Sequence, residues 1–120
     1  MSYLQKAKEL QAMIGQGKSI EALDKFYHDD VVVVDGNRPA RNGKAEQKAA
    51  VQSWYDMIQE MHGGGVGAIT SDEENGITTA ESWVEITMKG GNRMKMEEVT
   101  VQQWKGDKII HERFYYSLPE

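Results

Sequence analysis

The stretch MKMEEVTVQQWKGDKIIHERFYYS, residues 94–117, decides the fold of this chain. Side chains along a β-strand point alternately to opposite faces, and polar and apolar residues alternate in both halves of the stretch. A polar, glycine-containing segment at residues 105–108 separates the halves, so the stretch predicts a β-hairpin. The predicted rows are Met94, Met96, Glu98, Thr100, Gln102 and Trp104 in the first strand, and Ile110, Glu112, Phe114 and Tyr116 in the second, with Ile109, His111, Arg113 and Tyr115 opposite.

Each strand carries a carboxylate within a mainly apolar and aromatic row, Glu98 in the first and Glu112 in the second. A buried carboxylate costs several kcal/mol unless it is paired or hydrogen-bonded. Glu98 is therefore interpreted either as an acid that faces a pocket or as one half of a buried pair. The sequence does not identify a partner for Glu112.

Composition narrows the possible functions. The 120 residues suit a single domain spanning 1–120, and a net charge of -5 argues against binding to nucleic acid. No cysteine is present, which is typical of a cytoplasmic protein, and no aliphatic run approaches the length of a membrane span. The three histidines are scattered without ligand spacing. The sequence therefore predicts a cytoplasmic protein with no metal, no cofactor, no nucleic-acid partner and no membrane contact.

Hydrophobic periodicity outlines the remaining elements. It predicts helices over residues 2–15, from Ser19 to about residue 27, and from Asn42 to about Met61. Strands are predicted at 31–34, 66–71 and 77–88, and the glycine run 63–65 is expected to end the third helix and bend the sheet. Three N-terminal helices packed on one face of a curved antiparallel sheet make an α+β domain, with a cavity between the long helix and the sheet.

The chain resembles the nuclear transport factor 2-like (NTF2-like) superfamily, and within it the SnoaL-like and ketosteroid-isomerase-like bacterial proteins. The resemblance covers nearly the whole chain. It rests on the helix-to-strand run 20–31, on Asn42-Gly43-Lys44 at the start of the third helix, and on residues 94–99, 104–109 and 114–116. The resemblance implies a cone-shaped fold, but its members include isomerases, cyclases, hydrolases, dehydratases and non-catalytic binding domains.

Carried over residue by residue, the resemblance places Asp35 where ketosteroid isomerases have the aspartate that moves a proton next to a carbonyl. Leu10 and Thr100 stand at the positions of their tyrosine and protonated aspartate, so those oxyanion donors are absent. Ser117 stands where the polyketide cyclases often carry an aspartate. The resemblance therefore extends neither to steroid isomerisation nor to the cyclase site.

Asp35 and Glu98 are the predicted catalytic residues. Asp35 follows a buried strand, where it would act as a base in an aromatic cavity or cap the backbone of the turn at Asn37. Several polar and aromatic residues would either line the pocket or fill the core. Those predicted to bind substrate are Tyr27, Trp54, Tyr55, Thr100, Gln102, Trp104, Glu112, Phe114 and Tyr116.

The sequence thus predicts a pocket protein for a small, largely apolar molecule, with proton transfer of the isomerase, lyase or cyclase kind. The alternative is a non-catalytic ligand-binding or dimerisation domain. Val99 and Val101, with Trp83, are assigned to the convex face of the sheet. An apolar patch on that face predicts a homodimer through the sheet.

Overall fold

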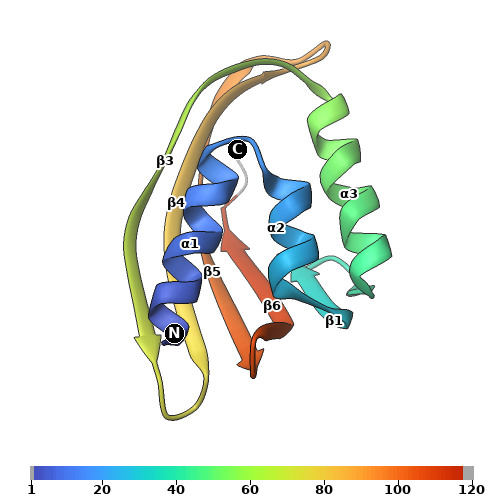
Figure 1. Ribbon diagram of the computed structural model, residues 1–120. Helices are drawn as coiled ribbons and strands as arrows, with labels where there is room; N and C mark the ends of the chain where they lie inside the picture. Colours follow the sequence, from blue (N-terminus) through green and yellow to red (C-terminus); the bar gives the residue numbers. More distant parts are fainter. Residues whose placement is uncertain (1, 118–120) are drawn as a thin grey trace.

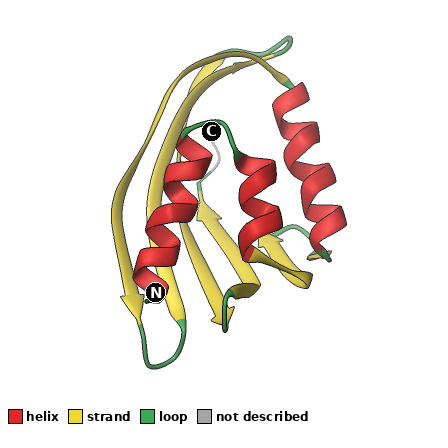
Figure 2. Ribbon diagram, viewed as in Figure 1, coloured by secondary structure: helices red, strands yellow, loops and turns green. Residues whose placement is uncertain are grey.

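The computed structural model describes residues 2–117, which form three helices and a six-stranded sheet (Figure 1). The helices lie on one side of the sheet (Figure 2). The elements are α1 (Tyr3–Gly15), α2 (Ser19–Phe26), β1 (Tyr27–Asp35), β2 (Arg41–Asn42), α3 (Lys44–Asp56), β3 (Ile58–Asp72), β4 (Ile77–Met88), β5 (Arg93–Lys105) and β6 (Lys108–Tyr116).

The sheet is curved, with the strand order β2-β1-β6-β5-β4-β3. All neighbouring strands are antiparallel except β1 and β6, which run parallel because α2 leads into β1 from the opposite end. This arrangement confirms the predicted α+β fold and the β5–β6 hairpin. The parallel pair is the one departure from a purely antiparallel sheet.

The core lies where α1 packs against β3 and β4 and α2 packs against β1 and β6. Ser2 caps α1 by accepting a hydrogen bond from the backbone of Gln5, whose side chain accepts one in return. Trp104 packs edge-on against Phe26, with ring centroids 5.8 Å apart. The buried apolar residues of this core are Ala7, Leu10, Ala22, Leu23, Phe26, Tyr27, Val31, Val33, Trp104 and Ile109.

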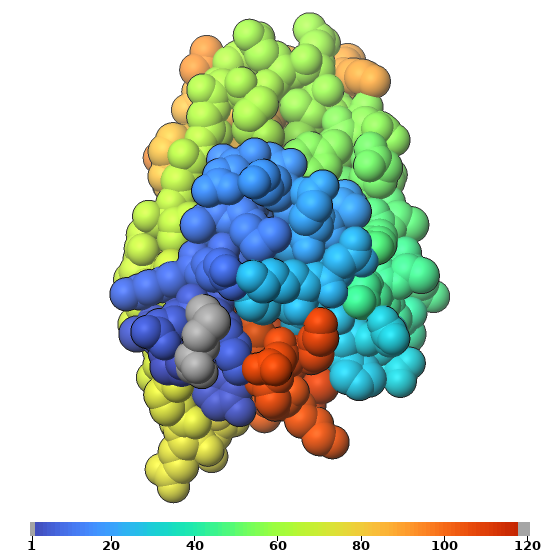
Figure 3. Space-filling model, viewed as in Figure 1, coloured from blue at the N-terminus to red at the C-terminus, as the bar shows by residue number. Residues whose placement is uncertain are grey.

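The opposite end of the sheet extends beyond the helices. In the space-filling view, the blue surface of α1 and α2 covers the middle of this face, and the sheet projects past it (Figure 3). We call these two parts the closed end, at the core, and the open end, where β3, β4 and β5 continue past α1 and α2.

The rows of β6 differ from the prediction at Ile109. The sequence placed Ile109 on the face opposite Glu112, but the structure buries it completely in the core. The cause is an irregularity between Gln103 and Trp104, after which Trp104 pairs with Ile109. Such a bulge shifts the alternation by one residue, so Ile109 joins the helix-facing side.

The end of α3 also differs. The prediction extended this helix to Met61, whereas α3 ends at Asp56 and β3 begins at Ile58. Met57 and Met61 are consequently about half exposed rather than packed, at 53% and 48%. The glycine run 63–65 lies inside β3 instead of breaking a helix.

The glycines of β3 make room for Trp83 of the neighbouring strand. A Cβ on Gly65 would lie 2.6 Å from Trp83 Nε1, and one on Gly63 would lie 3.5 Å from the same ring. Trp83 is paired with Gly65 in the register of β3 and β4. The indole therefore lies flat against a strip of bare backbone, in the manner of an aromatic residue that shields a strand glycine.

We predict that Gly65→Ala lowers the free energy of unfolding by about 1–3 kcal/mol, because the new methyl group collides with the indole. Thermal unfolding followed by circular dichroism measures the change. Gly15→Ala is the matched control, since nothing lies within 4 Å of that position. In a Trp83→Ala background, Gly65→Ala should cost much less, and an equal cost in both backgrounds would contradict this explanation.

Candidate functional site

The strand register places the predicted site residues in cross-strand rows on the helix-facing side of the sheet. Gln102 pairs with Glu112, Thr100 with Phe114, and Glu98 with Tyr116. β1 extends two of these rows, because Val33 pairs with Glu112 and Asp35 with Phe114. Paired residues in adjacent strands share a face, so Asp35, Glu98 and Glu112 all lie on the side toward the helices.

The row nearest the closed end is a buried network of hydrogen bonds. The Tyr27 hydroxyl donates to Glu112 Oε2 at 2.5 Å, and Gln102 Nε2 donates to the same oxygen at 2.6 Å. Thr78 Oγ1 donates to Gln102 Oε1 at 2.9 Å and accepts from Trp104 Nε1 at 2.8 Å. These five side chains are almost fully buried, and together they join β1, β4, β5 and β6.

Glu112 is incompletely satisfied within this network. Its side chain is 1% exposed, and Oε1 has no hydrogen-bond partner among the described residues. Burial raises the pKa of Glu112 above its usual range, while the bonds from Tyr27 and Gln102 oppose that shift. Burial and the neighbouring Glu112 carboxylate also raise the pKa of Tyr27 well above its ordinary value, so Tyr27 remains a donor.

Asp35 faces a cation. The carboxylate lies 3.5 Å from the Arg41 guanidinium, and the two side chains are about one-quarter exposed. Arg41 also donates from Nε to Gln47 Oε1 at 2.7 Å, which ties the end of β1 to α3 through β2. Asp35 thus lies on the helix-facing side of the sheet, with its charge balanced by Arg41.

Glu98 is the one member of the cluster without a counter-charge in the described chain. It takes part in no hydrogen bond or ion pair there, and it is half-buried. Burial, with smaller contributions from the carboxylates of Asp35 and Glu112, raises the pKa of Glu98 to about 7. A carboxyl group with this pKa is present in both protonation states at neutral pH.

Tyr116 completes the row of Glu98. Burial and the adjacent Asp35 carboxylate raise the pKa of the Tyr116 hydroxyl, so the phenol stays protonated at neutral pH. Its ring packs against the turn that follows β1, since a Cβ on Gly36 would lie 3.2 Å from the phenol oxygen. The hydroxyl is therefore held close to the carboxylates of Asp35 and Glu98.

Beyond Glu98 the helix-facing row of β5 becomes apolar. Met96 and Met94 continue the row, opposite Val84 and Ile86 of β4. Met94, Met96 and Val84 remain partly exposed although they face the helices, whereas Thr100, Gln102 and Trp104 toward the closed end are buried. Ile86 is fully buried, so the opening on the helix-facing side lies along Met94, Met96 and Val84, with Glu98 at its boundary.

The long helix contributes the two predicted aromatic residues to this region. Trp54 and Tyr55 are half-buried and stack edge-on, with ring centroids 5.3 Å apart. The Tyr55 hydroxyl is hydrogen-bonded to Ser19 Oγ at 2.7 Å, so Tyr55 joins α3 to α2. Trp54 is only half-buried, which is more typical of a residue that lines a pocket than of a core residue.

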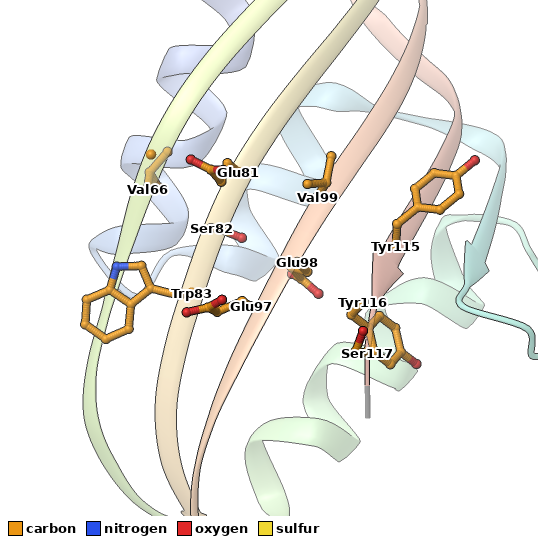
Figure 4. Close-up of a pocket in the computed structure, with 11 residues that line it drawn as sticks. Val66, Glu81, Ser82, Trp83, Glu97, Glu98, Val99, Tyr115, Tyr116 and Ser117 are labelled. Carbon is orange, nitrogen blue, oxygen red and sulfur yellow. The ribbon is translucent and has the colours of Figure 1, made fainter. Parts of the chain in front are cut away.

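The sheet also carries an open hollow of about 690 Å³ on its outer face, and the lining of this hollow reaches Glu98 and Tyr116 (Figure 4). It lies along β4 and β5 near the point where β6 ends, and the helices lie behind the sheet in this view. Its exposed apolar side chains are Val66, Trp83, Val99 and Tyr115, at 43%, 38%, 36% and 50%. The predicted convex-face positions of Trp83 and Val99 are confirmed.

The structure thus brings Tyr27, Gln102 and Glu112 into one network, with Trp104 attached through Thr78, and sets Asp35, Glu98 and Tyr116 next to it. Sequence reasoning missed Thr78, Arg41 and Gln47. Gln47 carried a usable signal, because it shares a helix face with Val51 and Trp54 and a polar residue on such a face calls for a partner. Arg41 lies in an irregular segment and gave no comparable signal.

Two kinds of feature are absent from the described residues. The described residues contain no group of three or more His, Asp or Glu side chains arranged to hold a metal ion. Within residues 2–117, no helix is long and apolar enough to cross a membrane.

Comparison with known proteins identifies the family. A family model described as SnoaL-like domain matches residues 1–116. The chain belongs to the SnoaL-like domain family. No curated protein matches it in sequence.

Solved structures agree with this assignment. A proposed SnoaL-like polyketide cyclase from Mesorhizobium loti, also labelled carbohydrate phosphatase, is 28% identical, with a TM-score of 0.86 and coverage of 97% of this chain and 100% of that one. A proposed polyketide cyclase from Pseudomonas putida is 16% identical, with a TM-score of 0.81 and coverage of 98% and 93%. A proposed isomerase from Bacillus subtilis is 14% identical, with a TM-score of 0.81 and coverage of 98% and 90%. The last two show the fold alone, which is the predicted NTF2-like fold.

We predict that Glu98 makes stability depend on pH. Its pKa rises from 4.5 to about 7 on folding, so between these values the folded state retains a proton that the unfolded chain has released. The free energy of unfolding should therefore fall as pH rises through this interval. Glu98→Gln removes the ionisation and should stabilise the protein above pH 7 by about 1–2 kcal/mol, allowing for solvent screening.

Thermal unfolding of both proteins from pH 4 to pH 8 tests this prediction. Glu74→Gln, in the exposed turn between β3 and β4, makes the same charge change away from the site. The control should leave the pH dependence unchanged. A Glu98→Gln protein whose stability follows the same pH curve as the unaltered chain would contradict the assignment.

Proposed function

We propose that this protein binds a small, largely apolar molecule between α3 and the open half of the sheet, and that Glu98 exchanges a proton with it. The observation that carries the proposal is the position of Glu98, an unpaired carboxyl group at the boundary between the apolar and polar halves of the helix-facing side. An unpaired, half-buried acid is costly for stability alone, and such groups are concentrated at functional sites.

The geometry supports general acid–base chemistry by Glu98. A group with a pKa of about 7 can accept a proton from a bound molecule and return it at neutral pH. Tyr116, in the same row, is a protonated hydroxyl that can donate a hydrogen bond to charge developing on the molecule. This is the proton-transfer step of an isomerase, a lyase or a cyclase.

Asp35 takes a supporting role in this proposal. Arg41 already balances its charge, while its carboxylate contributes to the raised pKa of Glu98. We therefore assign the proton-accepting role to Glu98 first and to Asp35 second. The buried network of Tyr27, Gln102 and Glu112 forms the floor that keeps these groups in place.

The alternative function is a non-catalytic ligand-binding or dimerisation domain. It is favoured by the engagement of two donors of the site in other bonds: Arg41 is engaged by Asp35 and Gln47, and Tyr27 by Glu112. A pocket with one donor can bind and orient a molecule without stabilising an oxyanion. Cytoplasmic localisation is part of our proposal for either function, on the basis of the cysteine-free composition.

Exchange of ligand hydrogens with solvent separates the two functions. Small apolar ketones, alcohols and amines are first screened for binding by ligand-observed NMR, and the molecules that bind are incubated with the protein in D₂O. We predict protein-dependent loss of a ligand C–H signal, slowed about 10²-fold or more by Glu98→Gln and less by Asp35→Asn. The exchange rate of the unaltered protein should rise with pH up to about 7.

Glu74→Gln should exchange at the normal rate. Binding without exchange for every molecule would favour the non-catalytic domain. Exchange that is insensitive to Glu98→Gln would refute the role given to Glu98.

We further propose that the outer hollow is covered by a second copy of the chain. Its surface is self-complementary in charge, because Lys95 and Arg113 lie over the rings of Trp83 and Tyr115 at 4.9 Å each and alternate with Glu81 and Glu97. A two-fold axis through this face would set the cations of one copy against the acids of the other and cover the exposed aromatic groups.

We predict a dimer mass by light scattering at tens of micromolar, and a shift toward monomer in Tyr115→Glu, which places a charge in the hollow. Ala12→Glu, on the exposed side of α1, adds the same charge on the helical face and should remain dimeric. A monomer mass for the unaltered protein would exclude the dimer.

A further inference from the structure

The site formed by Asp35, Glu98, Glu112 and Tyr116 on the helix-facing side, which we call the inner site, has more hydrogen-bond acceptors than free donors. Among the described residues, the donors next to the carboxylates are already used: Arg41 binds Asp35 and Gln47, while Tyr27 and the Gln102 amide bind Glu112. Glu98 has no partner. The donors that remain, such as the Tyr116 hydroxyl, are neutral, whereas the acceptors include the unpaired carboxyl group of Glu98.

Glu112 provides a second observation of the same kind. Its side chain is 1% exposed, and its Oε1 has no hydrogen-bond donor. A buried acceptor without a donor costs free energy, and in low dielectric it is stabilised by any positive charge that arrives nearby. Glu112 and Glu98 are close enough for the charge of one to disfavour the charge of the other. The inner site therefore lacks positive charge at two separate carboxyl groups.

The apolar half of the same side suits the substituents of a small organic molecule. Met94 and Met96 lead from the open end to Glu98, and methionine side chains adapt to ligands of irregular shape. Aromatic side chains frame the polar end, with Phe114 and Tyr116 in the rows of Asp35 and Glu98. Aromatic faces next to carboxylates are the usual surroundings of a bound ammonium group.

We propose that the molecule bound at the inner site is a small organic cation, an amine or ammonium with apolar substituents, whose charged group lies against Glu98 and whose substituents lie along Met96 and Met94. This inference rests on the proposed function for the location of the pocket, and it adds the chemical class of the ligand. The same arrangement disfavours anionic molecules such as phosphates and carboxylates, because the three carboxyl groups of Asp35, Glu98 and Glu112 outnumber the nearby cations Arg41 and Arg38.

The proposal sets the direction of the pH dependence. The charged and titratable groups that face Glu98 are Asp35 of β1, Glu112 and Tyr116 of β6, and Arg41 of β2 behind Asp35, with Arg38 near Tyr116 and Tyr27 near Glu112. Glu98, with a pKa of about 7, changes charge in this range. A cation favours the ionised carboxylate, so affinity for it should rise with pH across this range. The affinity for a neutral ligand that accepts a proton from Glu98 would instead fall as pH rises.

A charged ligand and its neutral isostere test the inference directly. Choline and 3,3-dimethylbutan-1-ol have nearly the same shape and differ by one positive charge, and 3,3-dimethylbutanoate supplies the anion. Binding of each is measured by ¹H–¹⁵N NMR titration of the full chain at pH 6 and pH 8, following the amides of Glu98, Thr100 and Tyr116. At pH 8 we expect choline to bind about tenfold more tightly than its isostere, and the anion not to bind.

Glu98→Gln should remove the preference for choline and its pH dependence, while Glu74→Gln should preserve both. A neutral isostere or an anion that binds at these amides as tightly as choline would overturn the inference and leave the proposed pocket intact. If the screen for apolar ligands and these three probes all fail to shift the amides, the pocket itself is refuted. Choline shifts confined to Trp83, Val99 and Tyr115 on the outer face would also overturn the inference.

Discussion

The buried bond between Glu112 and its two donors is the interaction on which the inner side of this protein depends. Glu112 Oε2 accepts from Tyr27, at the junction of α2 and β1, and from Gln102 of β5. The carboxyl group thus connects an N-terminal helix, the parallel strand pair and the C-terminal hairpin at one point. Replacing it by an apolar residue would leave two buried donors unpaired, which is costlier than the loss of one ordinary hydrogen bond. The network holds the strands together at the closed end, and the open end lies outside it.

The open end depends instead on the lack of side chains at the glycines of β3. β3 carries glycines where Trp83 of β4 lies against it, so the indole is on the outer face and occupies no space on the inner one. β3, β4 and β5 can then continue past α1 and α2, with Met94, Met96 and Val84 only partly covered. The helix-facing row of β5 therefore changes along its length, from buried polar residues at the closed end to partly exposed apolar residues at the open end. The site results from this gradient more than from any single residue.

Much of the fold was predictable from residues 94–117, because strict alternation fixes which side chains share a face. The inner row of Glu98, Thr100 and Gln102 and the outer position of Val99 followed from this pattern alone. The errors arose where the period changes without a sequence signal. The bulge at Gln103 and Trp104 moved Ile109 into the core, and α3 ended five residues early because Met57, Ile58 and Met61 fit a helix pattern as well as a strand.

The site was less predictable for a different reason. Sequence identified Asp35, Glu98 and Glu112 as acids needing an explanation, but the explanation depends on which long-range partner each one meets. Asp35 meets Arg41 of the two-residue strand β2, which carried no strand signal, and Glu112 meets Tyr27, 85 residues away in sequence. Glu98 meets none in the described chain. The three acids are equivalent in an alternation pattern, and only tertiary structure separates the neutralised acid, the hydrogen-bonded acid and the unpaired one.

That separation is also the argument for function. A fold that needed only stability could replace Glu98 by a methionine, extending the row of Met94 and Met96 and removing the cost of a half-buried charge. The same chain satisfies Asp35 and most of Glu112 with dedicated partners, so its architecture has the means to neutralise an inner acid. A carboxyl group left without such a partner, at the boundary of an open apolar region, is poised to interact with something that the chain itself does not contain.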